Sequence, residues 1–422
     1  MQLTDFCVCN TGNDTSEAIK TKASEGAPSA FPFLEMDQTA PGILGKFRDA
    51  DDRTETDSST SKCSGPRRNY PYQLSDVHIV KTIGSGRFGF VQLGLSKQGG
   101  KLLLLNSYQK SILVDTCQQH IPLREKDILE ELRHPFISTL LGCVQDDSNL
   151  YMISEAQLGG DLSRLLMTSS DRSSQYFKIP QFVKTNEICL SDNHKAFYAA
   201  CVTSVLKYCH SKNIILRGLH PDTLYIDSDG YLKVTDWGFA KRIHENTFTL
   251  CGHVEYLCPE AVLSDSGYGK GADYWALGIL IYEMLAGRSP FVVRTNSEHG
   301  TGPEAGFDDA STVENIISGN ISYPEYFSTS ARSIIGGLCQ KNPAVRLGCV
   351  KTGRGIRDVT QHPWFSSIDW DKLEKKELRA PWVPDVQDSN QLKYFGDGVY
   401  VDVSSSAPFD GYDHPEWKSF CK

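Results

Sequence analysis

A change in the spacing of apolar residues near position 156 limits the folds open to this chain. From Leu74 to about residue 105, alternating apolar runs are broken by a glycine-rich segment and a QGG turn, which predicts antiparallel strands joined as a meander. Two further short strands, STLLGCV and NLYMISE, complete this part of the chain, which ends at Glu155. One helix is expected within this part, over IPLREKDILEEL. After residue 156, FYAACVTSVLKYCHS and DYWALGILIYEML read as strongly apolar helices. We therefore expect an α+β fold with a small antiparallel-β lobe plus one helix, about 74–155, and a large, mainly α lobe, about 156–365.

Composition and charge exclude several classes of protein. The net charge of -9 argues against nucleic acid as a partner. The longest apolar runs fall short of the roughly 20 residues that a membrane span needs, so no transmembrane segment is expected. The N-terminus lacks a secretory pattern, and the Cys residues form no CxxC pair, so we expect a cytoplasmic protein. Cys7 and Cys9 are interpreted as exposed residues, with lipidation as the alternative.

Polar segments divide the chain further. Residues 1–73 are rich in Ser, Thr, Asp, Gly and Pro and are predicted to be a disordered N-terminal extension. Residues 168–187 and 293–311 have few apolar anchors and are interpreted as surface insertions. The segment 366–422, which contains FSSIDWDKL, KYFGD and WKSF, follows as a tail.

Several motifs occur in an order that is informative as a set. GSGRFGFV places glycines in a strand-turn-strand where the backbone can approach phosphates, although this pattern alone also marks ordinary turns. A helix with Glu125, the loop LRGLHPDT, DWG, CPE and a helix with Asp273 follow. The chain thereby resembles the AGC group of protein kinases, most closely the cGMP-dependent and cAMP-dependent kinases, over residues 74–422.

The resemblance implies ATP and Mg between the two lobes. The residues it assigns to a nucleotide are Gly84, Gly86, Gly89, Val91, Glu155, Asp161 and Asp236, and Asp236 is the one that would still bind Mg weakly. Regulatory and structural positions are Glu125, Arg217, Thr249, Glu260, Asp273, Arg346, Trp417 and Phe420. Among these, Arg217 would pair with a phosphate on Thr249, Glu260 with Arg346, and the aromatic pair of the tail would dock on the small lobe. Leu129, Leu140, Leu216 and Trp237 would join the lobes as a hydrophobic stack.

The catalytic positions depart from the family pattern together. Asn106 stands where a lysine should grip phosphates, and we expect it to hydrogen-bond to Glu125 instead. Gly218 occupies the place of the general base, and Thr223 that of an asparagine that holds a metal ion. His220 replaces a lysine and is a candidate substitute base, and His253 replaces a threonine.

The adenine side of the expected pocket has changed as well. Leu104 lies two residues before Asn106 on the same face of the strand, where the family has alanine. Tyr225 stands where the family has leucine. The added carbon atoms predict a nucleotide pocket that the protein fills itself.

These departures favour a pseudokinase that acts as a binding or allosteric signalling module and requires no cofactor, with ATP and Mg bound at reduced affinity if at all. The alternative is a weakly active or unconventional serine/threonine kinase, with Arg87 at the phosphates and His220 or Asp222 as base. The expected partners are proteins, either an active AGC kinase or a regulatory subunit.

Overall fold

The computed structural model describes residues 6–7, 70–86, 88–170, 192–263, 266–293, 308–349, 355–386, 393–395, 417–418 and 420–421. Most of the extension 1–73 and of the two insertions, 168–187 and 293–311, therefore lies outside the described residues, as do Arg87 and Cys9. The chain divides into a unit of Met1–Cys7 with Cys63–Lys422, treated below, and a second unit, Val8–Lys62, which is not described.

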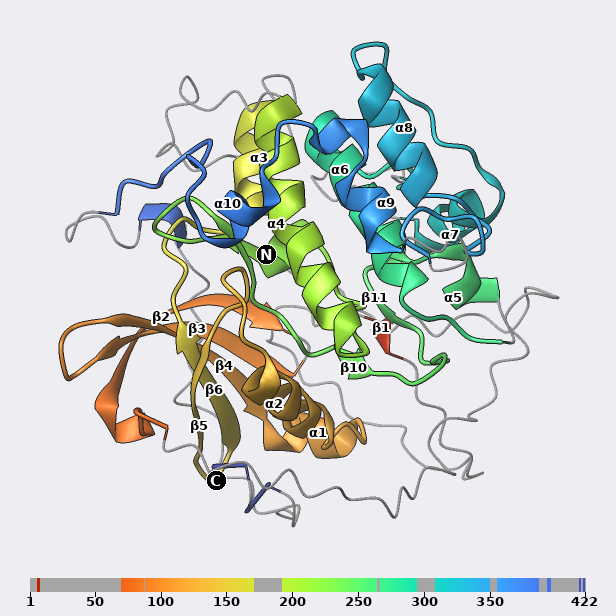
Figure 1. Ribbon diagram of the computed structural model, residues 1–422. Helices are drawn as coiled ribbons and strands as arrows, with labels where there is room; N and C mark the ends of the chain where they lie inside the picture. Colours follow the sequence, from red (N-terminus) through yellow and green to blue (C-terminus); the bar gives the residue numbers. More distant parts are fainter. Residues whose placement is uncertain are drawn as a thin grey trace, which may run out of the picture. The chain divides into compact units, whose positions relative to one another are not determined.

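The small lobe is a five-stranded antiparallel sheet with two helices (Figure 1). Its strands are β2 (Val77–Gly86), β3 (Gly89–Ser96), β4 (Leu102–Gln109), β5 (Leu140–Gln145) and β6 (Asn149–Glu155). The strand order is β2-β3-β4-β6-β5, so the meander predicted for the first three strands is present, and β5 lies beyond β6 at the edge of the sheet. Two helices, α1 (Lys110–Asp115) and α2 (Ile121–Glu131), lie between β4 and β5 in the chain, where the sequence predicted only the helix that corresponds to α2. After α2 the chain therefore forms β5 at the edge of the sheet, and β6 then lies between β5 and β4.

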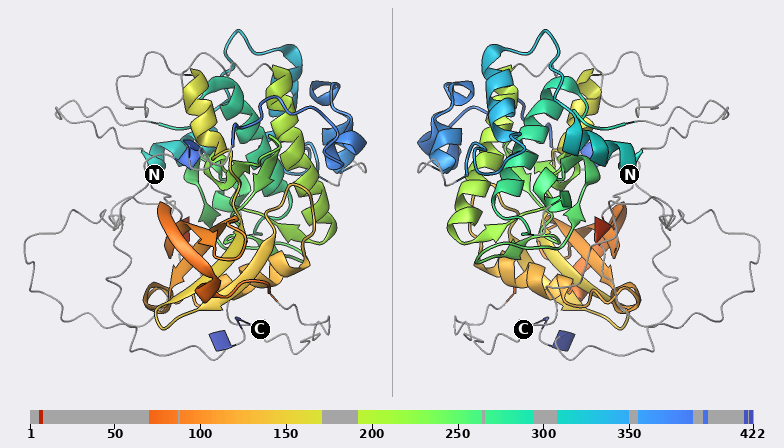
Figure 2. Two further views of the ribbon diagram at one scale, coloured as in Figure 1. Left: turned by 90° about the vertical axis from the view of Figure 1, so that its left-hand side faces the viewer. Right: turned by 90° about the vertical axis from the view of Figure 1, so that its right-hand side faces the viewer.

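The large lobe is built around two buried helices, α4 (Asp192–Ser211) and α6 (Gly271–Ala286). Around them lie α3 (Leu162–Ser170), α5 (Pro259–Leu263), α7 (Asp309–Ser318), α8 (Thr329–Leu338), α9 (Ile356–Thr360) and α10 (Trp370–Glu374) (Figures 1 and 2). Gly278 lets α6 approach α8, because a Cβ there would lie 2.5 Å from the Cys339 sulfur. The two-lobed α+β prediction is confirmed.

Short strand pairs shape the loops between the lobes. β7 (Ile214–Ile215) pairs with β10 (Lys241–Arg242), and β8 (Leu224–Ile226) pairs with β9 (Leu232–Val234). β1 (Phe6–Cys7) pairs antiparallel with β11 (Cys251–Gly252). Phe6 and Cys7 belong to the extension that was predicted to be disordered, and here they form a short strand pair. No helix of the described part is long and apolar enough to cross a bilayer.

Asp273 of α6 fixes the loop LRGLHPDT from below. Its buried carboxylate accepts hydrogen bonds from the backbone N–H of Leu216 and of Arg217, both 3.0 Å, and lies 2.7 Å from His210 Nε2. Several backbone donors on one carboxylate hold the chain at that point rigidly.

The tail returns to the small lobe. Trp417 and Phe420 are fully buried. The Trp417 carbonyl accepts from Gln145 Nε2 at 3.0 Å, and its indole N–H donates to the Gln119 carbonyl at 3.2 Å. The Lys110 ammonium lies 5.7 Å from the centre of the indole ring. The tail therefore covers the end of β5 and the turn that precedes α2.

Arg346 and Glu260 form a bidentate ion pair inside the large lobe. The guanidinium has no exposed surface, and its two terminal nitrogens donate to Glu260 Oε1 and Oε2 at 2.5 and 2.8 Å. Further donations reach the carbonyls of Gly271 and Gln340, and the ring of Trp275 lies 5.2 Å away.

Replacing Arg346 with Met should destabilise the chain by about 3–5 kcal/mol, because Glu260, whose side chain is only 11% exposed, would lose its partner. Urea unfolding measures the change, with Arg357→Met on the exposed surface of α9 as the matched control. A loss of less than about 1 kcal/mol would contradict this account of the ion pair.

Candidate active site

The strand β4 places Asn106 and Leu104 on the cleft side of the small lobe. Asn106 is paired with Val91 of β3 and Met152 of β6, so its position in the sheet is fixed. The expected hydrogen bond from Asn106 to Glu125 is wrong for the described residues. Instead, the Tyr108 hydroxyl donates to Glu125 Oε2 at 2.5 Å, because the longer phenol reaches α2 and the short amide does not. Strand alternation put Tyr108 on the same face and was the missed signal.

Glu125 and Asp236 are neighbouring acidic groups with no lysine between them. Glu125 is 1% exposed, and its Oε1 has no hydrogen-bond partner among the described residues. Burial, and then the charge of Asp236, raise the pKa of Glu125 to about 8. Burial also raises the pKa of Asp236, whose Oδ1 accepts from the Gly238 N–H at 2.9 Å. Burial therefore disfavours the charged form of both carboxyls, and Asn106 stands where the resemblance would place the lysine that pairs with Glu125.

The adenine region holds protein side chains. Leu104 is 4% exposed and belongs to one hydrophobic cluster with Ile83, Leu93 and Phe395, against which Val91 and Tyr225 pack. Phe395 comes from the tail and was not singled out by sequence reasoning, although KYFGD offered the signal. Carbon atoms from both lobes and the tail therefore share this space, which supports the filling predicted from Leu104 and Tyr225.

A cavity of about 120 Å³ remains beside this cluster. Of the residues that sequence analysis singled out, those lining it are Gly86, Gly89, Val91, Leu104, Asn106, Asp222, Thr223, Tyr225 and Asp236. Gly84, Glu155 and Asp161 do not line it. Glu155 pairs with Lys101 at 3.1 Å, and Asp161 accepts from Ser163 and pairs with Arg164. The cavity thus lies toward the glycine-rich turn and Asp236.

The catalytic loop has little room for a base at Gly218. A Cβ added there would lie 3.0 Å from the ring of Phe239. The Thr223 hydroxyl accepts from the His220 N–H at 3.2 Å and lies 2.8 Å from the His220 carbonyl and 3.1 Å from the Gly218 carbonyl. Thr223 therefore closes the loop on itself through its hydroxyl.

His220 is directed to the activation segment. Its Nε2 lies 3.3 Å from Glu255 Oε1, and its ring stacks on His253 with centroids 3.7 Å apart. Burial acts to lower the pKa of His220, but the hydrogen bond with Glu255 and the charge of Asp222 outweigh burial and raise it. Burial, and then the charge of His220, hold the pKa of His253 well below its usual value. A raised pKa leaves less of the neutral imidazole of His220 available to accept a proton at neutral pH, and His220 does not line the cavity.

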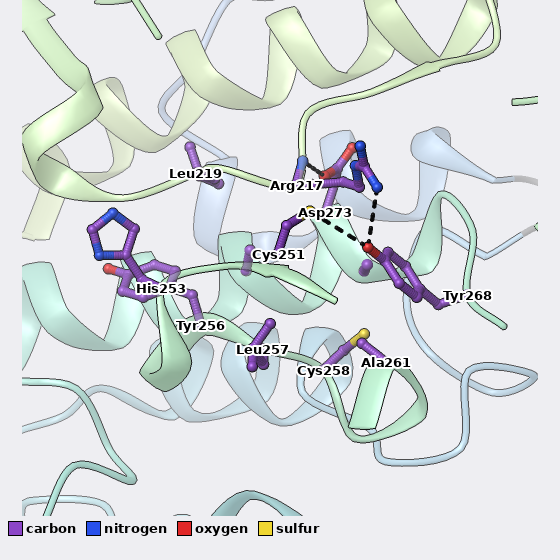
Figure 3. A pocket seen from close by; sticks show the side chains of 12 residues that line it. Arg217, Leu219, Cys251, His253, Tyr256, Leu257, Cys258, Ala261, Tyr268 and Asp273 are labelled. Atoms are coloured by element: carbon purple, nitrogen blue, oxygen red, sulfur yellow. Dashed lines mark hydrogen bonds between the residues drawn. The ribbon is translucent and has the colours of Figure 1, made fainter. Parts of the chain in front are cut away.

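Tyr268 connects Arg217 with the segment that contains Thr249, a contact that sequence reasoning missed. Arg217 donates from Nε to the Phe239 carbonyl at 2.7 Å and from Nη1 to the Tyr268 hydroxyl at 3.5 Å. That hydroxyl donates to the Thr249 carbonyl at 2.5 Å. Figure 3 shows Arg217, Tyr268 and Cys251 around a small cavity of about 20 Å³. Arg217 thus contacts the region of Thr249 through a phenol.

The remaining predicted contacts lie inside the core. Leu129, Leu140, Leu216 and Trp237 are buried and belong to one cluster that includes residues of both lobes. The described residues contain no group of three or more His, Cys, Asp or Glu side chains placed to hold a metal ion.

Comparisons with known proteins agree with this architecture. The family described as "Protein kinase domain" matches residues 77–365. A cAMP-dependent protein kinase catalytic subunit of Arthrobotrys oligospora is 38% identical over 75% of this chain and 54% of its own length. Catalytic subunit 3 of Drosophila melanogaster is 36% identical over 86% and 56%. The human catalytic subunit PRKX is 32% identical over 86% and 93%.

The chain thus spans little more than half of the first two relatives, and nearly the whole of the third. The match over residues 77–365, together with the sheet, the helical lobe and the loop held by Asp273, shows that this chain belongs to the protein kinase family, with similarity to cAMP-dependent catalytic subunits of the AGC group.

Proposed function

We propose that the chain is an AGC-type pseudokinase, a kinase fold that serves as a binding or allosteric signalling module with little or no phosphotransfer. One observation carries the proposal: Gly218 offers no side chain at the base position, and Phe239 lies 3.0 Å from where a Cβ would stand. Loss of a general base typically costs about 10²- to 10⁴-fold in rate.

The surroundings of Gly218 support the same conclusion. The residues present do not fit ATP with Mg, because the cavity of about 120 Å³ is small and the adenine region is filled by protein. None of the described residues that line the cavity is Lys, Arg or His. A triphosphate would therefore meet carboxylates without a compensating cation. Of the two positions where the resemblance places metal ligands, only Asp236 offers a carboxylate, since the other is Thr223. The proposal therefore requires neither ATP nor Mg.

A second function is a weakly active or unconventional serine/threonine kinase. The names of the relatives favour it, since each is called a protein kinase or its catalytic subunit. Within this chain the better substitute base is Asp222, which lines the cavity, whereas His220 faces Glu255. Arg87, the expected phosphate partner, lies outside the described residues.

Protein partners follow from the scaffold that remains. The ion pair of Arg346 with Glu260, the loop on Asp273 and the docked Trp417 keep a rigid kinase surface without a complete catalytic site. We propose an active AGC kinase or a regulatory subunit as partner, in the cytoplasm. A special closeness to cGMP-dependent kinases stays a prediction from the motifs.

Opening the adenine region should create ATP binding. In the variant Leu104→Ala, Tyr225→Leu, Asn106→Lys, saturating Mg-ATP should raise the melting temperature by several degrees, because ligand that binds the native state stabilises it. The natural chain should show no shift, and neither should Asn106→Lys alone, because the space stays filled. A metal-dependent shift in the natural chain would contradict the filled pocket.

Restoring the chemistry requires more than the base. We expect phosphate transfer from labelled ATP to a Ser/Thr peptide mixture only when Gly218→Asp and Thr223→Asn are added to the opened variant. The natural chain should be at least about 10³-fold slower, since the groups act as a unit. Activity of the natural chain that falls on Asp222→Asn or His220→Ala would support the second function.

The buried carboxyl of Glu125 predicts a dependence of stability on pH. Because its folded pKa, about 8, lies above its ordinary value of 4.5, its contribution to stability is full below pH 4.5 and is lost as the pH rises toward 8. Glu125→Gln does not titrate, so its stability relative to the natural chain should improve by at least about 1 kcal/mol between pH 5 and 8. Urea unfolding at both pH values measures this, with the exposed Glu325→Gln as control. A difference that does not change with pH would show that Glu125 is ionised throughout.

A further inference from the structure

The cavity beside the filled adenine region lies on the side of the site where the resemblance places phosphates. It lies between the glycine-rich turn, β4 and Asp236, while Glu155, at the end of β6, does not line it. Its volume of about 120 Å³ is near that of an engineered cavity of about 150 Å³ that binds benzene. The space therefore suits a group about the size of one aromatic ring.

The walls of this cavity are rich in aromatic side chains. Both lobes contribute them: Phe88, Phe90, Tyr108, Tyr225 and Phe239. Phe88 comes from the glycine-rich turn and is 8% exposed, so the turn brings an apolar ring to the place expected for phosphates. Aromatic rings attract cations through the negative potential of their faces, and they exclude water around them.

The lining formed by the described residues is acidic and includes no Lys, Arg or His side chain. Asp236 and Asp222 both line the cavity. Within the described residues, the Asp236 carboxylate has one hydrogen bond, from the Gly238 N–H at 2.9 Å. Asp222 lies 3.6 Å from His220 Nδ1, so part of its charge is matched on the side of the activation segment. Of these two carboxylates, Asp236 is the one without an ion pair within the described part of the chain.

A second acceptor lies behind Asp236. Glu125 is 1% exposed, and its Oε1 has no hydrogen-bond partner in the described part of the chain. Its other oxygen accepts from Tyr108, which itself lines the cavity. A Cβ on Gly238 would lie 3.4 Å from Asp236 Oδ1 and 3.6 Å from Glu125 Oε2, so the two carboxyl groups share one small region. A buried acceptor without a donor is unfavourable and is relieved by a donor or a positive charge.

We propose that this cavity binds a small organic cation, an amine joined to one aromatic ring and free of phosphate, with the ammonium at Asp236 and the ring among the aromatic walls. The inference rests on the proposed function in one respect: protein side chains, and not adenine, fill the neighbouring space. A bare divalent cation would find few oxygen ligands here, whereas an ammonium needs only one or two acceptors and a ring surface.

The test compares probes of equal shape and different charge on the full chain. Benzylammonium, benzyl alcohol and benzoate are titrated at pH 7, and binding is followed by calorimetry and by the melting temperature, with magnesium chloride alone as a further probe. We expect benzylammonium to bind at least about tenfold more tightly than benzyl alcohol, and benzoate not to bind.

Variants place the charge selectivity at Asp236. Asp236→Asn should reduce the preference for benzylammonium over benzyl alcohol to less than about twofold, whereas Asp147→Asn, on the exposed turn between β5 and β6, should leave it unchanged. Equal binding of the three probes by the natural chain would overturn the inference, and so would a preference that survives Asp236→Asn. The comparison of probes on the natural chain holds even if that variant fails to fold.

Failure of this inference is distinguishable from failure of the proposed function. Loss of charge selectivity without Mg-ATP binding leaves the pseudokinase proposal in place and removes the amine site. Phosphate transfer by the natural chain overturns the proposed function, and the probe titrations then still decide whether the cavity selects cations.

Discussion

The buried carboxylate of Asp273 is the interaction on which the arrangement of the site depends. It comes from α6, the apolar centre of the large lobe, and accepts the backbone N–H groups of Leu216 and Arg217. These bonds hold the loop in place whatever side chains follow it. The chain can therefore have glycine at position 218 and histidine at position 220 without losing the fold, because the loop is held through its backbone.

In the small lobe, Tyr108 compensates for the absence of a lysine at position 106. A charged Glu125 without a partner would be costly in a buried place, so the site combines a raised carboxyl pKa with a hydrogen bond from Tyr108. Helix α2 is thus tied to β4 by a phenol and a carboxyl in place of an ion pair. This link does not need a nucleotide to complete it, which suits a module whose surface is presented to partners without ATP.

Much of the fold could be predicted from sequence because local patterns determine it. The strand expected at NLYMISE and the helix expected at IPLREKDILEEL lie close to the observed bounds of β6 and α2. The place of β5 beyond β6 could not be read this way, since it depends on pairing across the sheet. In the site, residue type alone led to the prediction that Leu104 and Tyr225 fill the pocket, and both side chains pack in one cluster with Phe395. The hydrogen-bond partner of Glu125 could not be predicted, because Asn106 and Tyr108 lie on the same face of β4. Which of the two side chains reaches Glu125 depends on the distance from β4 to α2.

The two proposed functions differ in what they require of the loop LRGLHPDT. A kinase needs a substitute base that reaches the cavity, whereas a binding module needs none. A substitute base must reach the space where a hydroxyl group would react, next to Asp236. His220 is drawn away by Glu255 and by the ring of His253, and the same carboxylates that hold it also favour its protonated form. Asp222 does line the cavity, but its lining neighbours among the described residues bring no cation to neutralise a transferring phosphate. A base alone therefore does not restore transfer, because the missing positive charge acts on the phosphate and the base on the hydroxyl group.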